Sequence, residues 1–486
     1  MKIDLTLQPR DLKPALERMW KLSAAKLRSI AQSYPIERGT PVFTVKGRYT
    51  SRGWTEWTQG FLYGSALLQF DATGEKSFLT AGRADTLAHM ASHVTHFGVH
   101  DHGFNNVSTY GNLLRLMNEG RIPEHAGDRE ACVLALKASG AVQAQRWTPT
   151  ADGLGYIYSF NGPHSLFSDT IRSLRVLAVA HRLGHALMGE QDRRISLAER
   201  LLQHALTTAK YNVYFGAGRD AYDTPATRGR VVHESIFNTV NGVYRCPSTQ
   251  QGYTPFSTWT RGLAWILLGF AEQLEFLPQL ESAALAPCGG RNAVRKIFLD
   301  AATATADFYL AHSAADGIPF WDTGAPELHR LGDYTQAPAD PFNPHEPVDS
   351  SAAAIACQGF LRLGRVLAAG SAAEKTRARS YTQAGLTLLR TLLEEPYLST
   401  STKHEGLILH SVYHRPNGWD YVPPGRKVPC GEASLWGDYH AREAALYVER
   451  LIAQGPYYTF FHGLESGAAT PRSPGGAGTK RRRARG

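Results

Sequence analysis

The chain has 486 residues, 43% of them hydrophobic, and a formal net charge of +9, so it is long enough to bury a large core. No apolar run approaches the roughly 20 residues of a membrane-spanning helix, and the N-terminus lacks the basic and apolar regions of a signal peptide. We therefore expect a soluble protein that is not secreted by the usual route. Five scattered cysteines without a Cys-x-x-Cys pair are typical of a reducing compartment, so we expect a cytoplasmic protein.

Amphipathic segments with helical spacing follow one another along nearly the whole chain. Strand-like alternation is scarce, no heptad pattern persists, and no strict repeat of about 30–45 residues is visible. We therefore predict an all-α protein, in which sequential helical hairpins close into a double ring as one domain over residues 1–460. The expected helices span residues 12–33, 55–72, 76–97, 108–119, 128–146, 168–188, 195–214, 256–277, 292–314, 349–368, 373–394 and 432–453.

Residues 461–486 have a different composition, dominated by Gly, Ala, Pro and Ser, and contain six basic residues against one acid. We expect a disordered basic tail that carries five of the nine net positive charges. Its run from Lys480 to Arg485 could serve as a nuclear address or a weak polyanion contact. Because the excess charge lies mostly in this tail, we do not expect nucleic acid to be the partner of the folded body.

The first chemical motif is His100-Asp101-His102-Gly103, which follows the helical segment 76–97. Asp101 is predicted on a loop between helices, where binding and catalytic groups concentrate, or as a cap of the next helix near Ser108. The triplet could bind a metal, but alternate residues of an extended loop point in opposite directions and no further ligand cluster accompanies it. We therefore expect no metal.

A second acid, Asp169, begins the segment 168–188 beside Phe160 and Phe167. A carboxyl group that is partly dehydrated by aromatic rings has its charged form disfavoured, which raises its pKa and suits a general acid. The alternative is a plain helix N-cap.

An aromatic and basic cluster begins the helix expected over residues 256–277. Trp259 precedes Arg261, and Arg261 and Trp265 are four residues apart on one helix face. Aromatic faces stack on sugar rings, and a guanidinium group can grip a carboxylate with two hydrogen bonds. Trp54 and Trp57 form a second aromatic pair. Core tryptophans with a surface arginine are the alternative, but the pattern favours an anionic carbohydrate ligand.

Several common signatures do not occur in the sequence. It has no Walker A motif, no G-x-G-x-x-G after a strand, no G-x-S-x-G and no H-E-x-x-H. These absences count against nucleotide-binding, serine-hydrolase and zincin functions, and we expect no cofactor.

Taken in order, the motifs resemble those of the unsaturated glucuronyl hydrolases, glycoside hydrolase family 88, with the unsaturated rhamnogalacturonyl hydrolases as more distant relatives. The resemblance implies an (α/α)6 toroid, a six-hairpin double α-barrel, which removes a 4,5-unsaturated glucuronic acid from the non-reducing end of oligosaccharides left by polysaccharide lyases, without metal or cofactor. The motifs that carry it are Trp57-Thr58-Gln59-Gly60-Phe61, His100-Asp101-His102-Gly103-Phe104, Ser168-Asp169-Thr170, Ser257-Thr258-Trp259-Thr260-Arg261-Gly262 with Trp265, Asp349-Ser350-Ser351-Ala352 and Trp436-Gly437-Asp438-Tyr439.

The resemblance also implies a chemistry, in which the C4=C5 vinyl ether of the sugar is protonated at C4 and water adds at C5. By this likeness Asp169 is the general acid and then base, while Asp101 holds the sugar and stabilises the developing charge. The substrate-binding residues implied are Trp57, Phe160, His233, Gln251, Trp259, Arg261 and Trp265.

Some residues depart from the family pattern. Ser173 stands where the family has asparagine, Phe160 where a tryptophan is usual, and His102 where an apolar residue is common. The segment 410–427 is expected to meet the leaving sugar, with Arg426 and Lys427 either accepting an anionic aglycone or serving as ordinary surface charge. The alternative functions are an unsaturated rhamnogalacturonyl or galacturonyl hydrolase, and a non-catalytic toroid that binds acidic sugars.

Overall fold

The computed structural model describes residues 1–52 and 56–464. Trp54 and most of the expected basic tail, residues 465–486, lie outside these ranges. Among the helices that are described, none is both long and apolar enough to cross a membrane. All five cysteines are unpaired.

The helices form two concentric layers. The outer helices are amphipathic and each contacts an inner partner, whereas the inner helices are buried on nearly all sides. The inner layer consists of α2 (Gln59–Thr73), α5 (His102–Asn106) with α6 (Asn112–Asn118), α8 (Thr170–Ser173) with α9 (Arg175–Arg182), α11 (Thr260–Phe276), α14 (Ser350–Ala368) and α16 (Leu435–Ile452). The outer layer consists of α1 (Lys13–Ser33), α3 (Lys76–His89), α7 (Ala126–Gln145), α10 (Leu197–Asn212), α13 (Gly290–His312) and α15 (Ala372–Leu392).

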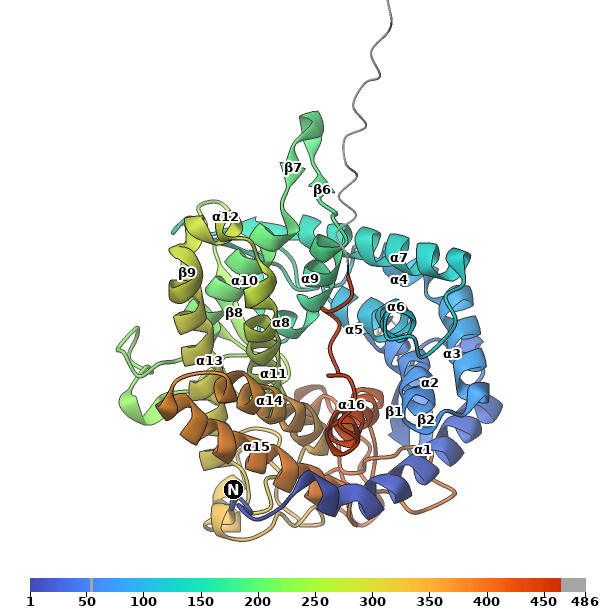
Figure 1. Ribbon diagram of the computed structural model, residues 1–486. Helices are drawn as coiled ribbons and strands as arrows, with labels where there is room; N and C mark the ends of the chain where they lie inside the picture. The colour runs from blue at the N-terminus through green and yellow to red at the C-terminus, as the bar shows by residue number, and fades with distance from the viewer. Residues whose placement is uncertain (53–55, 465–486) are drawn as a thin grey trace, which may run out of the picture.

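The inner helices close into a ring. Each one contacts the next along the chain, and α16 returns to contact α2. The colour gradient therefore passes once around the molecule and brings red α16 back beside blue α1 and α2 (Figure 1). The expected (α/α)6 toroid is confirmed.

Glycine residues allow the inner helices to approach one another closely. A Cβ atom on Gly60 of α2 would lie 2.2 Å from the backbone oxygen of Asn105 in α5. A Cβ atom on Gly103 of α5 would lie 2.1 Å from the backbone oxygen of Ser173 in α8. Both distances are far below van der Waals contact, so only glycine fits at these crossings.

Short antiparallel strands occupy the connections between helices. They are β1 (Pro41–Val45) with β2 (Arg48–Ser51), β3 (Trp147–Pro149) with β4 (Gly155–Ile157), β6 (Leu187–Met188) with β7 (Arg194–Ile195), and a sheet of β5 (Ser165–Phe167), β8 (Glu234–Phe237) and β9 (Tyr244–Ser248). The pairing of β5 with β8 aligns Phe167 with Glu234, next to His233. This sheet therefore brings the approach to Asp169 beside the connection between α10 and α11.

Most helix bounds lie within a few residues of the sequence prediction, with three larger differences. The helix expected at 168–188 is divided into α8 and α9 and ends at Arg182. The helix expected at 108–119 begins six residues earlier, at His102, and passes through a π-helical turn, Val107–Gly111. The helix expected at 76–97 is divided into α3 and a short α4 (Ala91–Val94), and a further short helix, α12 (Ser282–Leu285), precedes α13. Phe461 and Leu464 are buried, so the packed chain reaches at least Leu464, although the tail was expected to start at Phe461.

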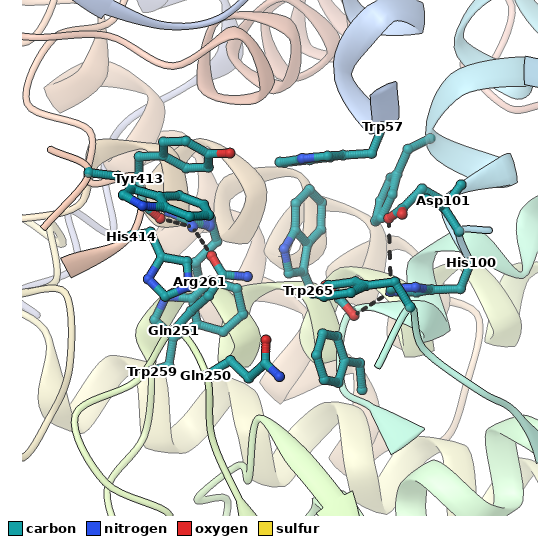
Figure 2. A pocket seen from close by; sticks show the side chains of 16 residues that line it. Trp57, His100, Asp101, Gln250, Gln251, Trp259, Arg261, Trp265, Tyr413 and His414 are labelled. Carbon is teal, nitrogen blue, oxygen red and sulfur yellow. Dashed lines mark hydrogen bonds and ion pairs between the residues drawn. The ribbon is translucent and has the colours of Figure 1, made fainter. Parts of the chain in front are cut away.

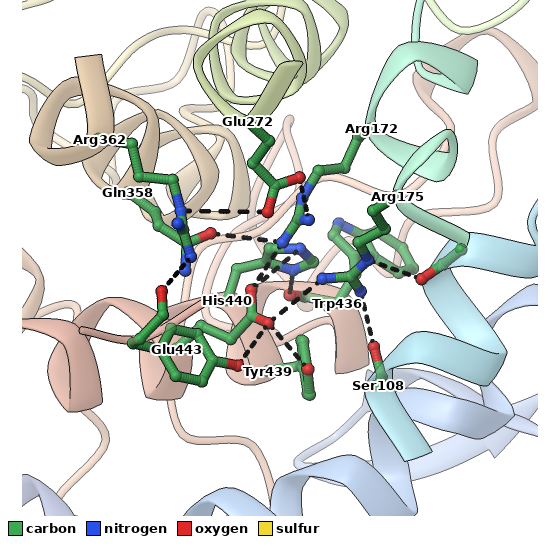
Figure 3. Close-up of polar contacts among 12 residues, drawn as sticks. Ser108, Arg172, Arg175, Glu272, Gln358, Arg362, Trp436, Tyr439, His440 and Glu443 are labelled. Atoms are coloured by element: carbon green, nitrogen blue, oxygen red, sulfur yellow. Dashed lines mark hydrogen bonds and ion pairs between the residues drawn. The ribbon is translucent and has the colours of Figure 1, made fainter. Parts of the chain in front are cut away.

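The centre of the ring is filled by a buried network of ionic side chains (Figure 3). Arg172 of α8 pairs with Glu272 of α11 and with Glu443 of α16, and its Nη2 lies 2.9 Å from the Glu443 carboxylate. Arg175 of α9 lies 3.5 Å from the same carboxylate and donates to the carbonyl of Gly103. One network therefore joins helices from opposite sides of the ring.

Candidate active site

A cavity lies at one end of the toroid, where the inner helices begin. Its wall includes residues at or just before the first turns of α2, α5, α8 and α11, together with the loop that precedes α16. The N-terminal ends of these helices therefore converge on one space. The lining residues are Trp57, Val99, His100, Asp101, Phe104, Phe160, Phe167, Asp169, Gln250, Gln251, Trp259, Arg261, Trp265, Tyr413, His414 and Trp419.

The two predicted acids stand at matching positions, each directly before an inner helix. Asp101 precedes α5 and Asp169 precedes α8, yet neither side chain accepts a capping hydrogen bond from its helix. Both are largely buried, with 6% of Asp101 and 9% of Asp169 exposed. The simple capping role considered for each residue is therefore not what their side chains perform.

His100 joins the two acids. Its Nε2 lies 3.3 Å from Oδ1 of Asp169 and 3.9 Å from Oδ1 of Asp101 (Figure 2). The ring stacks on Phe160 with centroids 6.2 Å apart and meets Phe167 edge-on, while its Nδ1 is buried without a protein partner. One imidazole therefore connects two carboxylates in a largely apolar wall.

The electrostatics of the pair differ from the sequence prediction. Burial raises the pKa of Asp169, but the hydrogen bond from His100 and the charges of His100 and His233 outweigh burial, so the pKa is lowered. Burial and the neighbouring Asp169 raise the pKa of Asp101 to about 6, against the opposing effect of His100. The aromatic rings beside Asp169 do not raise its pKa as expected, because His100 stabilises the carboxylate.

Aromatic rings make the floor and one side of the cavity. Trp57 stacks on Trp436 with centroids 5.0 Å apart, and Trp265 packs against Phe104 at 4.9 Å. Trp265 lies between Asp101 on one side and Arg261 on the other (Figure 2). Phe160 also lines the cavity and is 37% exposed.

Arg261 lines the cavity but is already engaged by the protein. Its Nη1 donates to Asp349 Oδ2 at 3.1 Å and to the carbonyl of Val412, and its Nη2 donates to Gln251 Oε1 at 2.7 Å and to the carbonyl of Tyr413 at 2.8 Å. The guanidinium also packs over Trp259 and Trp436. The two-pronged grip on a substrate carboxylate that the sequence suggested is therefore not presented, because these partners occupy both terminal nitrogens.

Gln251 is the side chain that Arg261 presents to the cavity. Its oxygen accepts from Arg261, and its amide nitrogen points away from that residue toward the open space (Figure 2). His233 supports this turn from behind, since its Nδ1 accepts from the backbone N–H groups of Gln250 and Gln251 at 3.1 and 3.3 Å. His233 is buried between Phe167 and Trp259. The family likeness implied that it binds the substrate, but it does not line the cavity.

The loop before α16 supplies Tyr413, His414 and Trp419 to the outer part of the cavity, within the segment expected to meet the leaving sugar. Asp420 holds this loop by accepting from the backbone N–H groups of Tyr413 and His414. Arg426 lies outside the lining, where it stacks on Phe342 and donates to its carbonyl at 2.9 Å. The sequence marked this segment by its position but did not single out the three rings.

His102, the residue that made a metal cluster conceivable, points away from the acids. Its Nδ1 bonds to Ser139 Oγ at 2.8 Å and its Nε2 to the carbonyl of His96 at 3.0 Å. Over residues 1–52 and 56–464, no group of three or more His, Cys, Asp and Glu side chains is arranged to hold a metal ion. His100, the other histidine of the triplet, is the one that faces the acids.

Comparisons with known proteins identify similar enzymes. No family model matches the chain. An unsaturated glucuronyl hydrolase from Formosa agariphila is 24% identical over 82% of this chain and 81% of its own length, and one from Bacillus sp. strain GL1 is 27% identical over 83% and 89%. A solved unsaturated glucuronyl hydrolase described as specific for heparin aligns with a TM-score of 0.67 at 20% identity, over 92% of this chain and all of its own. The resemblance and the toroid fold inferred from the sequence are confirmed.

Proposed function

We propose, from this likeness, that the protein is a glycosidase that releases 4,5-unsaturated glucuronic acid from the non-reducing end of oligosaccharides made by polysaccharide lyases. The observation that carries the proposal is the pair of buried carboxylates joined by His100, which faces Arg261 and Gln251 across a floor of tryptophan. Such a site offers a proton on one side of a sugar and the Gln251 amide, held by Arg261, on the other.

The reaction that fits is hydration of a vinyl ether. A proton adds to C4, positive charge develops at C5 and the ring oxygen, and water adds at C5 with loss of a proton to the base. The resulting hemiketal opens and the aglycone leaves. A buried carboxylate close to the charged ring stabilises this transition state more strongly than water would, because the site has a lower effective dielectric.

An anionic sugar suits the electrostatic design of the cavity. The first turn of α11 lies in the cavity wall, and helix N-termini favour negative charge. Arg261 is paired with Asp349, and the Gln251 amide nitrogen that Arg261 orients supplies a donor that faces the cavity. We infer that Gln251, oriented by Arg261, meets the uronate, and that Trp57, Trp259, Trp265 and Phe160 surround its ring.

The acids take different roles in this proposal. Asp169 delivers the proton to C4 and then accepts one from water, while Asp101 holds the sugar and balances the developing charge. Because His100 contacts both carboxylates, the three groups share their protons and titrate as one unit. The contact with His100 lowers the pKa of Asp169, so in this proposal His100, whose Nε2 lies 3.3 Å from Asp169, passes to it the proton that Asp169 first delivers to C4.

The test is turnover of an unsaturated glucuronyl disaccharide, followed as loss of the ultraviolet absorbance of its conjugated double bond. Asp169→Asn should lower kcat by about 100-fold or more, since a positioned general acid contributes about that much. Asp307→Asn, an exposed acid on the outer helix α13, is the matched control and should keep full activity. Full activity in Asp169→Asn would overturn the assigned role.

A panel of disaccharides decides the substrate class. It should contain unsaturated glucuronyl sugars with several linkages, with and without sulfate, and an unsaturated galacturonyl-rhamnose. Consumption of the last substrate alone would assign the protein to rhamnogalacturonyl chemistry. Binding of every sugar without loss of absorbance would indicate a non-catalytic toroid.

A further inference from the structure

A buried serine hydroxyl lies directly behind the two acids. Ser173 ends the short helix α8, four residues after Asp169, and its side chain has no solvent exposure. It is one of the residues at which the sequence departs from the family pattern. Nothing in the proposed reaction uses Ser173, so its contacts call for another explanation.

Ser173 holds both flanks of Asp101. Its Oγ donates to the carbonyl of His100 at 2.8 Å and accepts from the backbone N–H of Gly103 at 2.9 Å. These two groups belong to the residues on either side of the Asp101–His102 dipeptide. A single hydroxyl on the helix of Asp169 therefore fixes the backbone that carries Asp101.

Gln143 of α7 completes this arrangement from the outer layer. Its Nε2 donates to the carbonyl of His100 at 2.9 Å and to Ser173 Oγ at 3.1 Å. The Ser173 hydroxyl thus uses its one hydrogen and both lone pairs, and every partner is buried. Removing the hydroxyl leaves the Gly103 N–H without this acceptor in a dry environment.

The backbones meet closely at the same point. The amide of Gly103 reaches Ser173 Oγ only because Gly103 lacks a Cβ, which would lie 2.1 Å from the Ser173 carbonyl oxygen. The contact therefore joins the N-terminal turn of α5 to α8 without an intervening side chain.

We propose that Ser173 is a positioning residue, which clamps the His100–Gly103 backbone to α8 and so sets the separation and orientation of Asp101 and Asp169. The physical reason is that a proton donor and a charge-stabilising carboxylate act together only within a narrow geometry, and a displacement of about 1 Å can cost about 100-fold in rate. Ser173 touches neither the substrate nor the reacting atoms, and it acts through the two acids.

The test, which rests on the proposed function, compares Ser173→Ala with Ser173→Thr in the full chain. Ser173→Ala should lower kcat for the unsaturated disaccharide by about 10- to 100-fold with little change in KM, and should shift the pH–rate profile, because the acids no longer interact at a fixed distance. Ser173→Thr keeps the hydroxyl and should recover most of the lost kcat. The control is Ser23→Ala on the outer helix α1. The hydroxyl of Ser23 is equally buried and accepts from Arg442, and its removal should leave kcat unchanged.

A second variant keeps the proposal testable if Ser173→Ala unfolds. Gln143→Leu removes the outer arm of the clamp, and Ser173→Ala combined with Gln143→Leu should cost less than the product of the single effects, because residues of one network are not additive. Wild-type kcat and pH profile in folded Ser173→Ala, or fully multiplicative losses in the double variant, would overturn the positioning role. Absence of turnover in the wild type would instead overturn the proposed function.

Discussion

At the scale of single residues, the acids are tuned by burial against one shared imidazole. Burial raises the pKa of Asp101 to about 6, whereas His100 keeps Asp169 ionised. A buried acid with a raised pKa binds its proton more tightly in the folded protein than in the unfolded chain, where the Asp pKa is about 3.9. Folding stability should therefore fall as pH rises from about 4 to 6, because the charged form is disfavoured in the fold.

Asp101→Asn should remove this loss. We expect the variant to gain stability relative to the wild type as pH rises from about 4 to 7, by at most about 3 kcal/mol, while its turnover is strongly reduced. Urea unfolding at several pH values measures the difference. Asp152→Asn is the control. Hydrogen bonds from Lys210 and Thr150 outweigh burial and lower the pKa of Asp152 to about 2, so this variant should lose stability relative to the wild type as pH rises. A stability difference that does not vary with pH would contradict the assigned burial cost.

At the scale of elements, the sequence predicted the helices better than their beginnings. The helix at His102 was missed because its first turns carry His102, Asn105 and Asn106, which read as a polar loop. All three are buried. His102 bonds to Ser139, Asn105 accepts from the N–H of Gly60, and Asn106 donates to the carbonyl of His93. A sequence pattern does not distinguish polar residues that face water from those that face buried partners.

The same limit applies to the candidate site. Trp57, Asp101 and Trp265 line the cavity, since their motifs begin helices whose first turns converge there. The partners of Arg261 could not be inferred, because Asp349, Val412 and Tyr413 come from distant parts of the chain that only the closed ring brings together. Local spacing thus located the side chains, but tertiary contacts decide which of their polar atoms remain available.

The close crossing of α5 and α8 gives a prediction for an element. Gly103→Ala places a methyl group 2.1 Å from the Ser173 carbonyl oxygen, so the two helices must separate. We expect a loss of about 3 kcal/mol or more in the free energy of unfolding, together with a loss of turnover. Gly127→Ala is the matched control, because nothing lies within 4 Å of its Cβ position in α7 and alanine is the better helix former. Denaturant unfolding of both variants measures the effect, and equal stabilities would contradict this packing.

At the scale of the whole molecule, the ring surrounds its charged centre. Glu443 of α16 receives Arg172 at 2.9 Å, Tyr439 at 2.9 Å and Tyr458 at 3.0 Å, and none of these side chains is appreciably exposed. Burial alone would raise the pKa of Glu443, but Arg172 and Arg175 hold it well below its usual range. The carboxylate therefore stays charged and connects helices that are distant in the sequence.

Glu443→Gln should accordingly destabilise the entire toroid. Breaking one partner of a buried ionic network leaves uncompensated guanidinium charge, which typically costs about 3–5 kcal/mol. Urea unfolding followed by circular dichroism measures this loss as a lower denaturant midpoint, because Arg172, Glu272 and Glu443 join three different inner helices. Glu75→Gln breaks only an exposed pair with Arg28 and should change the midpoint far less. If the two variants unfold at the same denaturant concentration, the central network does not hold the ring closed, and the apolar contacts between neighbouring inner helices suffice.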